Sequence, residues 1–177
     1  DQNGPLALAG IMGGEISSCT DTTRDVFLES AFFTPASIAG RARRYGLQTD
    51  SSYRFERGVD SQLQRRAAER ATRLLLDIAG GQPGPIVEAV SPQHLPAEPA
   101  IRLRPERLRK LLGMDIPAVE VEEILRRLGM AVAVEVDHWL VAPPSSRFDI
   151  ALEVDLIEEI ARIHGYDRLP GNRPLTR

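Results

Sequence analysis

The chain has 177 residues, 42% of them hydrophobic and 27% charged, so it can bury a core and hold one domain or two small ones. The net charge of -3 excludes a whole-surface attraction to nucleic acid or to an anionic membrane. The only cysteine, Cys19, excludes an intrachain disulfide, and no apolar run reaches the roughly 20 residues of a membrane span. We therefore expect a cytoplasmic protein that does not bind membranes.

The basic side chains are unevenly placed along the chain. Of the 22 basic residues 21 are arginines, and nine of these lie between Arg41 and Arg73. Such a run is either a solvated helix face or a local basic surface, and the sequence leaves both open. The chain begins at Asp1 rather than Met, so we expect the polypeptide to continue before it and the first strand to lack its partners.

Two apolar runs predict strands near the start of the chain. Residues 6–12 have the pattern of a buried strand and are followed by two glycines. Residues 26–33 repeat this pattern, with Glu29 inside an otherwise apolar and aromatic segment. The carboxylate of Glu29 either faces solvent, as the alternation favours, or points into a pocket.

Helical patterns follow in the rest of the first half. A helix is predicted over residues 35–44, with a proline in its first turn. A longer amphipathic helix is predicted over residues 61–79, where apolar residues recur at helical spacing and two glycines follow. Between them, residues 46–58 are rich in hydroxyls and charges and form either the wall of a polar pocket or a plain loop.

A proline-rich stretch divides the chain into two predicted domains. Five prolines fall within residues 82–99, around one short predicted strand at residues 86–90. The second half then predicts strand, helix, helix, hairpin and helix, an order that resembles a winged-helix module. These elements are expected at residues 101–103, 105–112, 117–128, 130–136 with 139–141, and 152–163. The predicted fold class is α+β.

The last predicted helix carries a constellation of acids. Asp155, Glu158 and Glu159 are spaced by three and four residues, which places them within roughly 100° of arc on the helix, and Asp149 lies just before it. Converging carboxylates suit a hard cation such as Mg²⁺. Arg162, three and four residues beyond Glu159 and Glu158, offers an ordinary surface ion pair instead, and spacing alone leaves both interpretations open.

Other catalytic chemistry has little support in the sequence. The three histidines, His94, His138 and His164, are scattered, with no pair at metal-ligand spacing. There is no phosphate-binding P-loop and no G-x-S-x-G motif, and Cys19 has no base near it in sequence. Nucleophilic catalysis is therefore not expected.

Several motifs, in order along nearly the whole chain, resemble the β subunits of bacterial phenylalanyl-tRNA synthetases. They are LAGIMGGE at residues 8–15, LESAFF at 28–33, GLQT at 46–49, RFERGVD at 54–60, RFD at 147–149, DLIEE at 155–159 and HGYD at 164–167. Motifs that fall collinearly at the family's separations are far more specific than any one alone. The resemblance implies a class II aminoacyl-tRNA synthetase that joins Phe to tRNA-Phe with ATP, assembled as an α2β2 heterotetramer with the catalytic α subunit.

For residues 1–92, the resemblance implies the later part of an editing domain, an incomplete mixed α/β domain that hydrolyses Tyr wrongly attached to the tRNA. Its editing pocket would be lined by the positions Gly10, Glu29, Thr49 and Ser51, and Glu29 would bind the phenolic hydroxyl that distinguishes Tyr from Phe. The sequence departs from the family pattern at Ser51, where Ala is common, and at Tyr53, where His is common. No catalytic residue of aminoacylation is expected in the chain, and the isolated chain is expected to be inactive.

For residues 98–172, the resemblance implies the small winged-helix-like domain that follows. There, Asp149, Asp155, Glu158 and Glu159 would bind a Mg²⁺ shared with the α subunit. Two rival interpretations are a winged-helix module that binds nucleic acid without catalysis and a stand-alone Mg²⁺ hydrolase. Against the first, the helix that would enter the DNA groove is acidic, because it includes three glutamates beside two arginines within residues 119–128.

Overall fold

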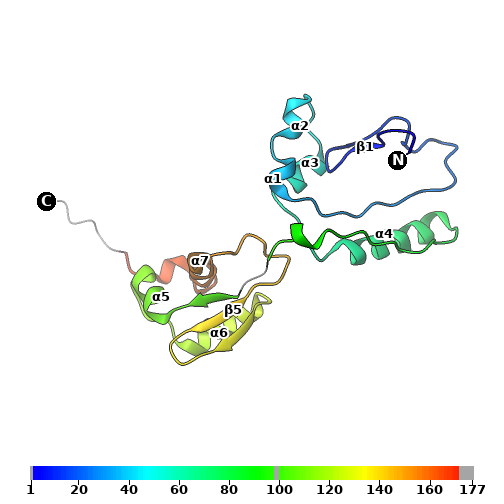
Figure 1. The fold of residues 1–177 in the computed structure, drawn as a ribbon. Coiled ribbons are helices and arrows are strands. Elements are labelled where there is room, and N and C mark those ends of the chain that lie inside the picture. The colour runs from blue at the N-terminus through cyan, green and yellow to red at the C-terminus, as the bar shows by residue number, and fades with distance from the viewer. Residues whose placement is uncertain (1, 98–99, 172–177) are drawn as a thin grey trace. The chain divides into compact units, whose positions relative to one another are not determined.

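The computed structural model describes residues 2–97 and 100–171, which fold into two compact units, Asp1–Pro96 and Ala97–Arg177 (Figure 1). Helices and small antiparallel sheets make up both units, which confirms the predicted α+β class. Residues 98, 99 and 172 of the predicted second domain lie outside the described residues. Within the part that is described, no helix is long and apolar enough to cross a membrane.

The first unit begins with a two-stranded hairpin rather than the single strand predicted over residues 6–12. Strand β1, Ala7–Leu8, pairs antiparallel with β2, Met12–Gly13. Gly10 lies in this turn with φ +70°, a left-handed backbone conformation that residues other than glycine rarely adopt. The turn was not predicted because an apolar run does not show where the chain reverses its direction.

The helix predicted over residues 35–44 is also two elements. Helix α1, Pro35–Ile38, is separated from α2, Arg41–Arg44, because Gly40 adopts a left-handed conformation with φ +74°. Residues 46–58, for which the sequence allows a pocket wall or a plain loop, contain helix α3, Asp50–Phe55. Thr49 caps α3: its hydroxyl accepts a hydrogen bond from the Ser52 backbone N–H at 3.0 Å.

Two predicted strands of the first unit are wrong. Residues 26–33 and 86–90 have no strand partner among the described residues. The first of these segments runs extended past α4 (Figure 1). The Phe27 side chain on it is 95% exposed. Without a neighbouring strand, the backbone N–H and C=O groups of an apolar segment cannot form the hydrogen bonds of a sheet. The helix predicted over residues 61–79 is confirmed as α4, Gln64–Ala79.

The buried core of the first unit is small. It consists of Ile11, Ile38 and Ala42, with three partly buried side chains, Phe33, Leu47 and Phe55, packed against it. The rings of Phe33 and Phe55 meet edge to face at 4.9 Å between centroids. This cluster joins the hairpin turn to α1, α2 and α3, so it fixes the backbone of the candidate pocket wall described below.

The second unit follows its predicted order closely. Its three-stranded antiparallel sheet has the order β3-β5-β4, and Val141 of β5 lies opposite both Ile101 and Val132. Three helices complete the unit, with α6 packed against β4 and α7, and α7 also in contact with β3 and α5. The bounds are β3 Ile101–Leu103, α5 Pro105–Leu112, α6 Ala118–Arg127, β4 Ala131–Val134, β5 Trp139–Ala142 and α7 Glu153–His164. Two single 3₁₀ turns, Pro92–His94 and Tyr166–Arg168, lie outside these elements.

Alternation along the strands builds the core of the second unit. In β3, Leu103 is fully buried while its neighbour Arg102 is exposed, as the two-residue period of a strand requires. The largest fully buried side chains share this core: Leu103, Val121, Leu125, Val141, Leu156 and Ile160. Each contributes about 1.5–3 kcal/mol relative to exposure in water. The unit therefore holds α7, which carries the acidic constellation, on a well-packed support.

Candidate functional site

Three of the four predicted editing-pocket residues lie together in the first unit. The Thr49 hydroxyl donates a hydrogen bond to the Ile11 carbonyl at 2.6 Å, and the Ser51 hydroxyl donates to the Gly10 carbonyl at 3.1 Å. These bonds join the start of α3 to the hairpin turn across 38 and 41 residues of sequence. The two elements form one continuous wall, which we call the hydroxyl wall: Gly10, Ile11, Thr49 and Ser51.

Gly10 leaves no room for a side chain at this wall. A Cβ placed on it would lie 2.9 Å from Cδ2 of Phe33 and 3.0 Å from Cδ1 of Ile38. The backbone of the hairpin turn therefore packs directly on the small core, and both the left-handed φ and this contact require glycine. Because the Gly10 and Ile11 carbonyls accept side-chain hydrogen bonds, the wall presents polar groups that are already partnered.

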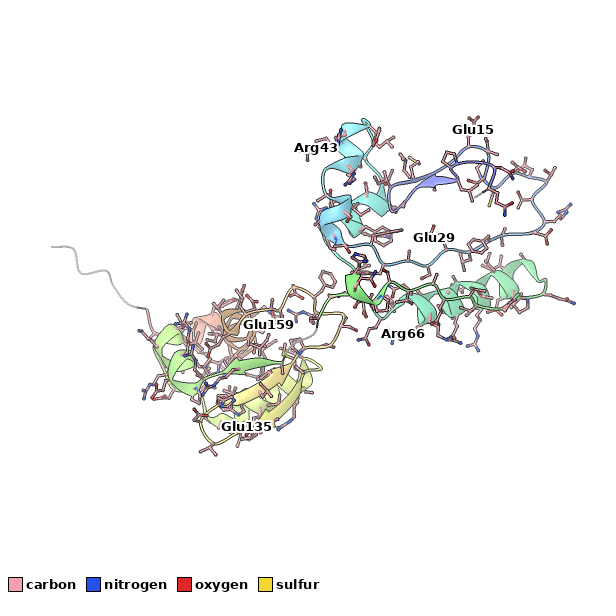
Figure 2. The ribbon with its side chains drawn as sticks, in the orientation of Figure 1. Glu15, Glu29, Arg43, Arg66, Glu135 and Glu159 are labelled. Carbon is pink, nitrogen blue, oxygen red and sulfur yellow. The ribbon has the colours of Figure 1, made fainter. Side chains whose placement is uncertain are left out.

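Glu29, the fourth predicted residue, lies apart from this wall. It is exposed on the extended segment of residues 26–33 and forms no ion pair with any described residue. Figure 2 shows its side chain on the side of this segment that is away from α4. An ionised carboxylate without a partner is a free hydrogen-bond acceptor for a ligand hydroxyl.

The acidic constellation in the second unit is neutralised by arginines. The Glu159 carboxylate is buried and accepts from Arg147 Nη1 at 3.0 Å and from Arg162 Nη2 at 2.6 Å. These two guanidinium groups, Arg147 first, lower the pKa of Glu159 to about 2, against the opposing effect of burial. Hydrogen bonds to Asp149 and then to Glu159 raise the pKa of Arg147. The ion pair with Arg162, one of the two interpretations left open by spacing, is therefore present.

The other acids of the constellation have separate roles. Arg147 Nη2 lies 2.7 Å from Asp149 Oδ2, and this bond holds the pKa of Asp149 below its usual range. The Asp155 carboxylate accepts from the backbone N–H groups of Ala151 at 2.9 Å and Leu152 at 2.7 Å, so it closes the N-terminus of α7. Glu158 is exposed and forms no ion pair with any described residue.

In the chain by itself, these four acids do not converge as magnesium ligands. Among the described residues no group of three or more His, Cys, Asp or Glu side chains is placed to hold a metal. Mg²⁺ needs free oxygen ligands in near-octahedral geometry, whereas the oxygens of Glu159 and Asp149 face guanidinium groups and those of Asp155 face backbone amides. Magnesium binding by Asp149, Asp155, Glu158 and Glu159 stays a prediction.

Sequence reasoning missed the residues that bind these acids. The sequence marks Arg147 only as part of the RFD motif at residues 147–149. Arg104 Nη2, also missed, lies 2.6 Å from Glu153 Oε2 and ties β3 to the start of α7. His164 is nearly buried, with Nδ1 at 2.7 Å from Glu120 Oε1, and no sequence spacing links these two residues.

Two protein families match the chain, one in each half. Residues 1–80 match the B3/4 domain, and residues 101–166 match the tRNA synthetase B5 domain. These matches give each unit a family assignment that is independent of the residue contacts described above.

Individual relatives match across both units. The chain is 62% identical over 174 residues to the phenylalanine–tRNA ligase beta subunit of Methylococcus capsulatus, 98% of this chain and 22% of that protein. It is 58% identical over 175 residues to that of Nitrosococcus oceani and 56% identical over 177 residues to that of Hahella chejuensis, in each case 99% of this chain and 22% of the relative. It thus spans about a fifth of the length of these relatives. The resemblance read from the motifs is confirmed, and the chain belongs to the phenylalanine–tRNA ligase β-subunit family as a segment with a B3/4 and a B5 domain.

Proposed function

We propose that this chain supplies one wall of a tRNA-editing pocket and a subunit-docking module to a phenylalanine–tRNA ligase. The complete enzyme would attach Phe to tRNA-Phe with ATP, and its β subunit would hydrolyse mischarged Tyr-tRNA. The observation that carries the proposal is the hydroxyl wall, in which Gly10, Thr49 and Ser51 come together from distant parts of the sequence. Residues 1–92 would form the later part of the editing domain, and residues 98–172 the small domain that docks.

Glu29 would supply the discrimination between Tyr and Phe. Its exposed carboxylate has no partner among the described residues, so it can accept a hydrogen bond from a phenolic hydroxyl. A site built to bond a hydroxyl rejects the analogue that lacks it by about 10⁴–10⁵-fold, whereas an apolar pocket barely rejects an added hydroxyl. An editing site that requires the hydroxyl can therefore select Tyr over Phe, whereas the aminoacylation site cannot reject Tyr by shape alone.

The test uses the complete β subunit assembled with its α subunit. Glu29→Ala should lower the rate of Tyr-tRNA-Phe deacylation about 10–150-fold, the equivalent of one charged hydrogen bond of about 1.5–3 kcal/mol. Charging of tRNA-Phe with Phe, which takes place in the other subunit, should stay at the parent rate. Glu15→Ala is the matched control, because Glu15 is an exposed acid of the same unit outside the proposed pocket (Figure 2). Equal deacylation by Glu29→Ala and the parent contradicts the role of Glu29.

The docking part of the proposal concerns the α7 helix of the second unit. The catalytic α subunit, in an α2β2 assembly, would contact the acidic face formed by Asp149, Asp155, Glu158 and Glu159. Because Arg147 occupies two of these carboxylates in the chain by itself, a shared Mg²⁺ would require the assembled enzyme. Co-purification of Asp155→Asn and Glu159→Gln β subunits with the α subunit, with metal content measured on each complex, tests this. Unchanged assembly and metal content in both variants removes the docking proposal.

The rival function, a winged-helix module that binds nucleic acid, finds no support in α6. Its two arginines, Arg126 and Arg127, are paired along the helix with Glu122 and Glu123. A helix whose cations are already neutralised has little charge left for a phosphate backbone.

A further inference from the structure

The arginines of the two units are used differently. Each unit contains ten described basic side chains. In the second unit eight of the ten form an ion pair, and only Lys110 and Arg168 form none among the described residues. In the first unit only Arg57 and Arg65 do so, although ten acids of the same unit are described. The arginines of the second unit thus bind its own acids, while most of those in the first unit are left for another partner.

Helix α4 aligns three of these unpaired arginines. Arg66, Arg70 and Arg73 are separated by four and three residues, so they lie within about 60° of arc and span about 10 Å along the helix. All three are exposed, and none forms an ion pair with a described residue. In Figure 2, Arg66 lies on the side of α4 away from the extended segment that carries Glu29. We call these three residues the arginine stripe.

The stability of α4 itself does not explain the arginine stripe. Like charges three and four residues apart on a helix disfavour it by about 0.2–0.5 kcal/mol per pair. The first turn of α4 contains no acid and its last turn no base, so the helix lacks the end charges that its dipole favours. Two acids lie at helical spacing from these arginines: Asp77, four residues after Arg73, and Glu69, four residues before it, which is already paired with Arg65. A negatively charged partner that lies along the helix would remove this repulsion.

We propose that the arginine stripe binds the phosphate backbone of RNA, with successive guanidinium groups on successive phosphates. With the spacing of about 3.4 Å per phosphate along one strand of duplex DNA as a guide, a length of about 10 Å covers about three phosphates. Arginine suits this contact because its planar fork bonds phosphate oxygens in pairs. The inference rests on the proposed function, which makes tRNA the RNA, and it places a contact on the B3/4 unit outside the hydroxyl wall.

The test measures tRNA-Phe binding by the complete ligase at a series of salt concentrations. In the variant with Arg66, Arg70 and Arg73 all changed to Gln, the slope of log Kobs against log salt should fall by about 2–3, at about 0.7–0.9 per lost phosphate contact. The matched control is Arg65→Gln, one residue away on α4, because Arg65 is already paired with Glu69 and Glu88 at 3.0 and 2.8 Å. Its slope should change by less than one third of that of the triple variant. Asp77→Asn, which removes the acid four residues after Arg73, should strengthen binding.

Two outcomes overturn the inference. One is an unchanged salt slope in the triple variant, with circular dichroism and subunit assembly like those of the parent. The other is loss of assembly with the α subunit, which would make the stripe a protein contact instead. A parent complex that binds no tRNA at all contradicts the proposed function itself, so the two failures are distinguishable.

Discussion

Replacing Glu159 by glutamine tests whether the arginine pair around it stabilises the second unit. The change keeps the size of the side chain and removes the charge that Arg147 and Arg162 share. The Glu159 side chain is 12% exposed, so its ion pairs are poorly screened by solvent. With one partner gone, Arg147 keeps only Asp149.

The magnitude follows from the pKa of Glu159. A fall of the Glu159 pKa from 4.5 to about 2 corresponds to about 3 kcal/mol, and solvent screening at the half-exposed Arg162 reduces this to about 2–3 kcal/mol. Because the folded-state pKa is depressed, the unfolded chain binds the proton first as the pH falls. The contribution is therefore fully present above pH 4.5 and is lost as the pH falls toward about 2.

Urea unfolding followed by tryptophan fluorescence measures this unit alone, because the single tryptophan, Trp139, is buried in β5. Glu159→Gln should lower the free energy of unfolding by about 2–3 kcal/mol at pH 7, and the difference from the parent should shrink by pH 2.5. Glu158→Gln, at an exposed neighbour without a described ion pair, is the control and should change it by less than about 0.5 kcal/mol. If the unfolding free energies of the parent and of Glu159→Gln depended on pH in the same way, the proposed link between the Glu159 pKa and stability would be refuted.

Two further substitutions test the packing of each unit. Gly10→Ala should destabilise the first unit by about 2–4 kcal/mol, because it adds left-handed strain to a contact of 2.9 Å with Phe33, and faster amide exchange in the hairpin measures this. A variant with parent-like exchange would contradict the tight contact. Leu125→Ala, at a fully buried position, should lower the unfolding free energy of the second unit by about 2–5 kcal/mol by Trp139 fluorescence. Leu111→Ala, at a half-exposed position, should lower it far less, and equal effects would count against the observed core.

The second unit was predictable because its strands and helices carry their own signals. The helix predicted over residues 105–112 has the observed bounds, since proline favours its first turn and Gly113 ends it. Leu103 and Arg102 alternate as a half-buried strand requires. In the first unit, residues 26–33 carry a strand pattern but no described partner, and a pattern cannot supply the neighbour that a strand needs.

The contacts of the candidate site residues could not be predicted from the sequence. The family resemblance pointed to Thr49 and Ser51, yet their bonds to the hairpin turn cross about 40 residues, and no local spacing encodes such a contact. Helical spacing placed Glu159 on an acidic face and offered Arg162 as its partner. It did not reveal Arg147, because that residue reaches Glu159 from the loop before α7, twelve positions earlier.

The hydroxyl wall also has a consequence for folding kinetics. Its two hydrogen bonds close chain loops of 38 and 41 residues, which costs about 3 kcal/mol of conformational entropy before either bond can form. The wall should therefore assemble after the local turns and helices, as a late step whose rate depends on the whole intervening segment. A substitution in the intervening segment that increases the conformational entropy of the unfolded chain lowers the population of the assembled wall. It does so even though the changed residue contacts neither Thr49 nor Ser51.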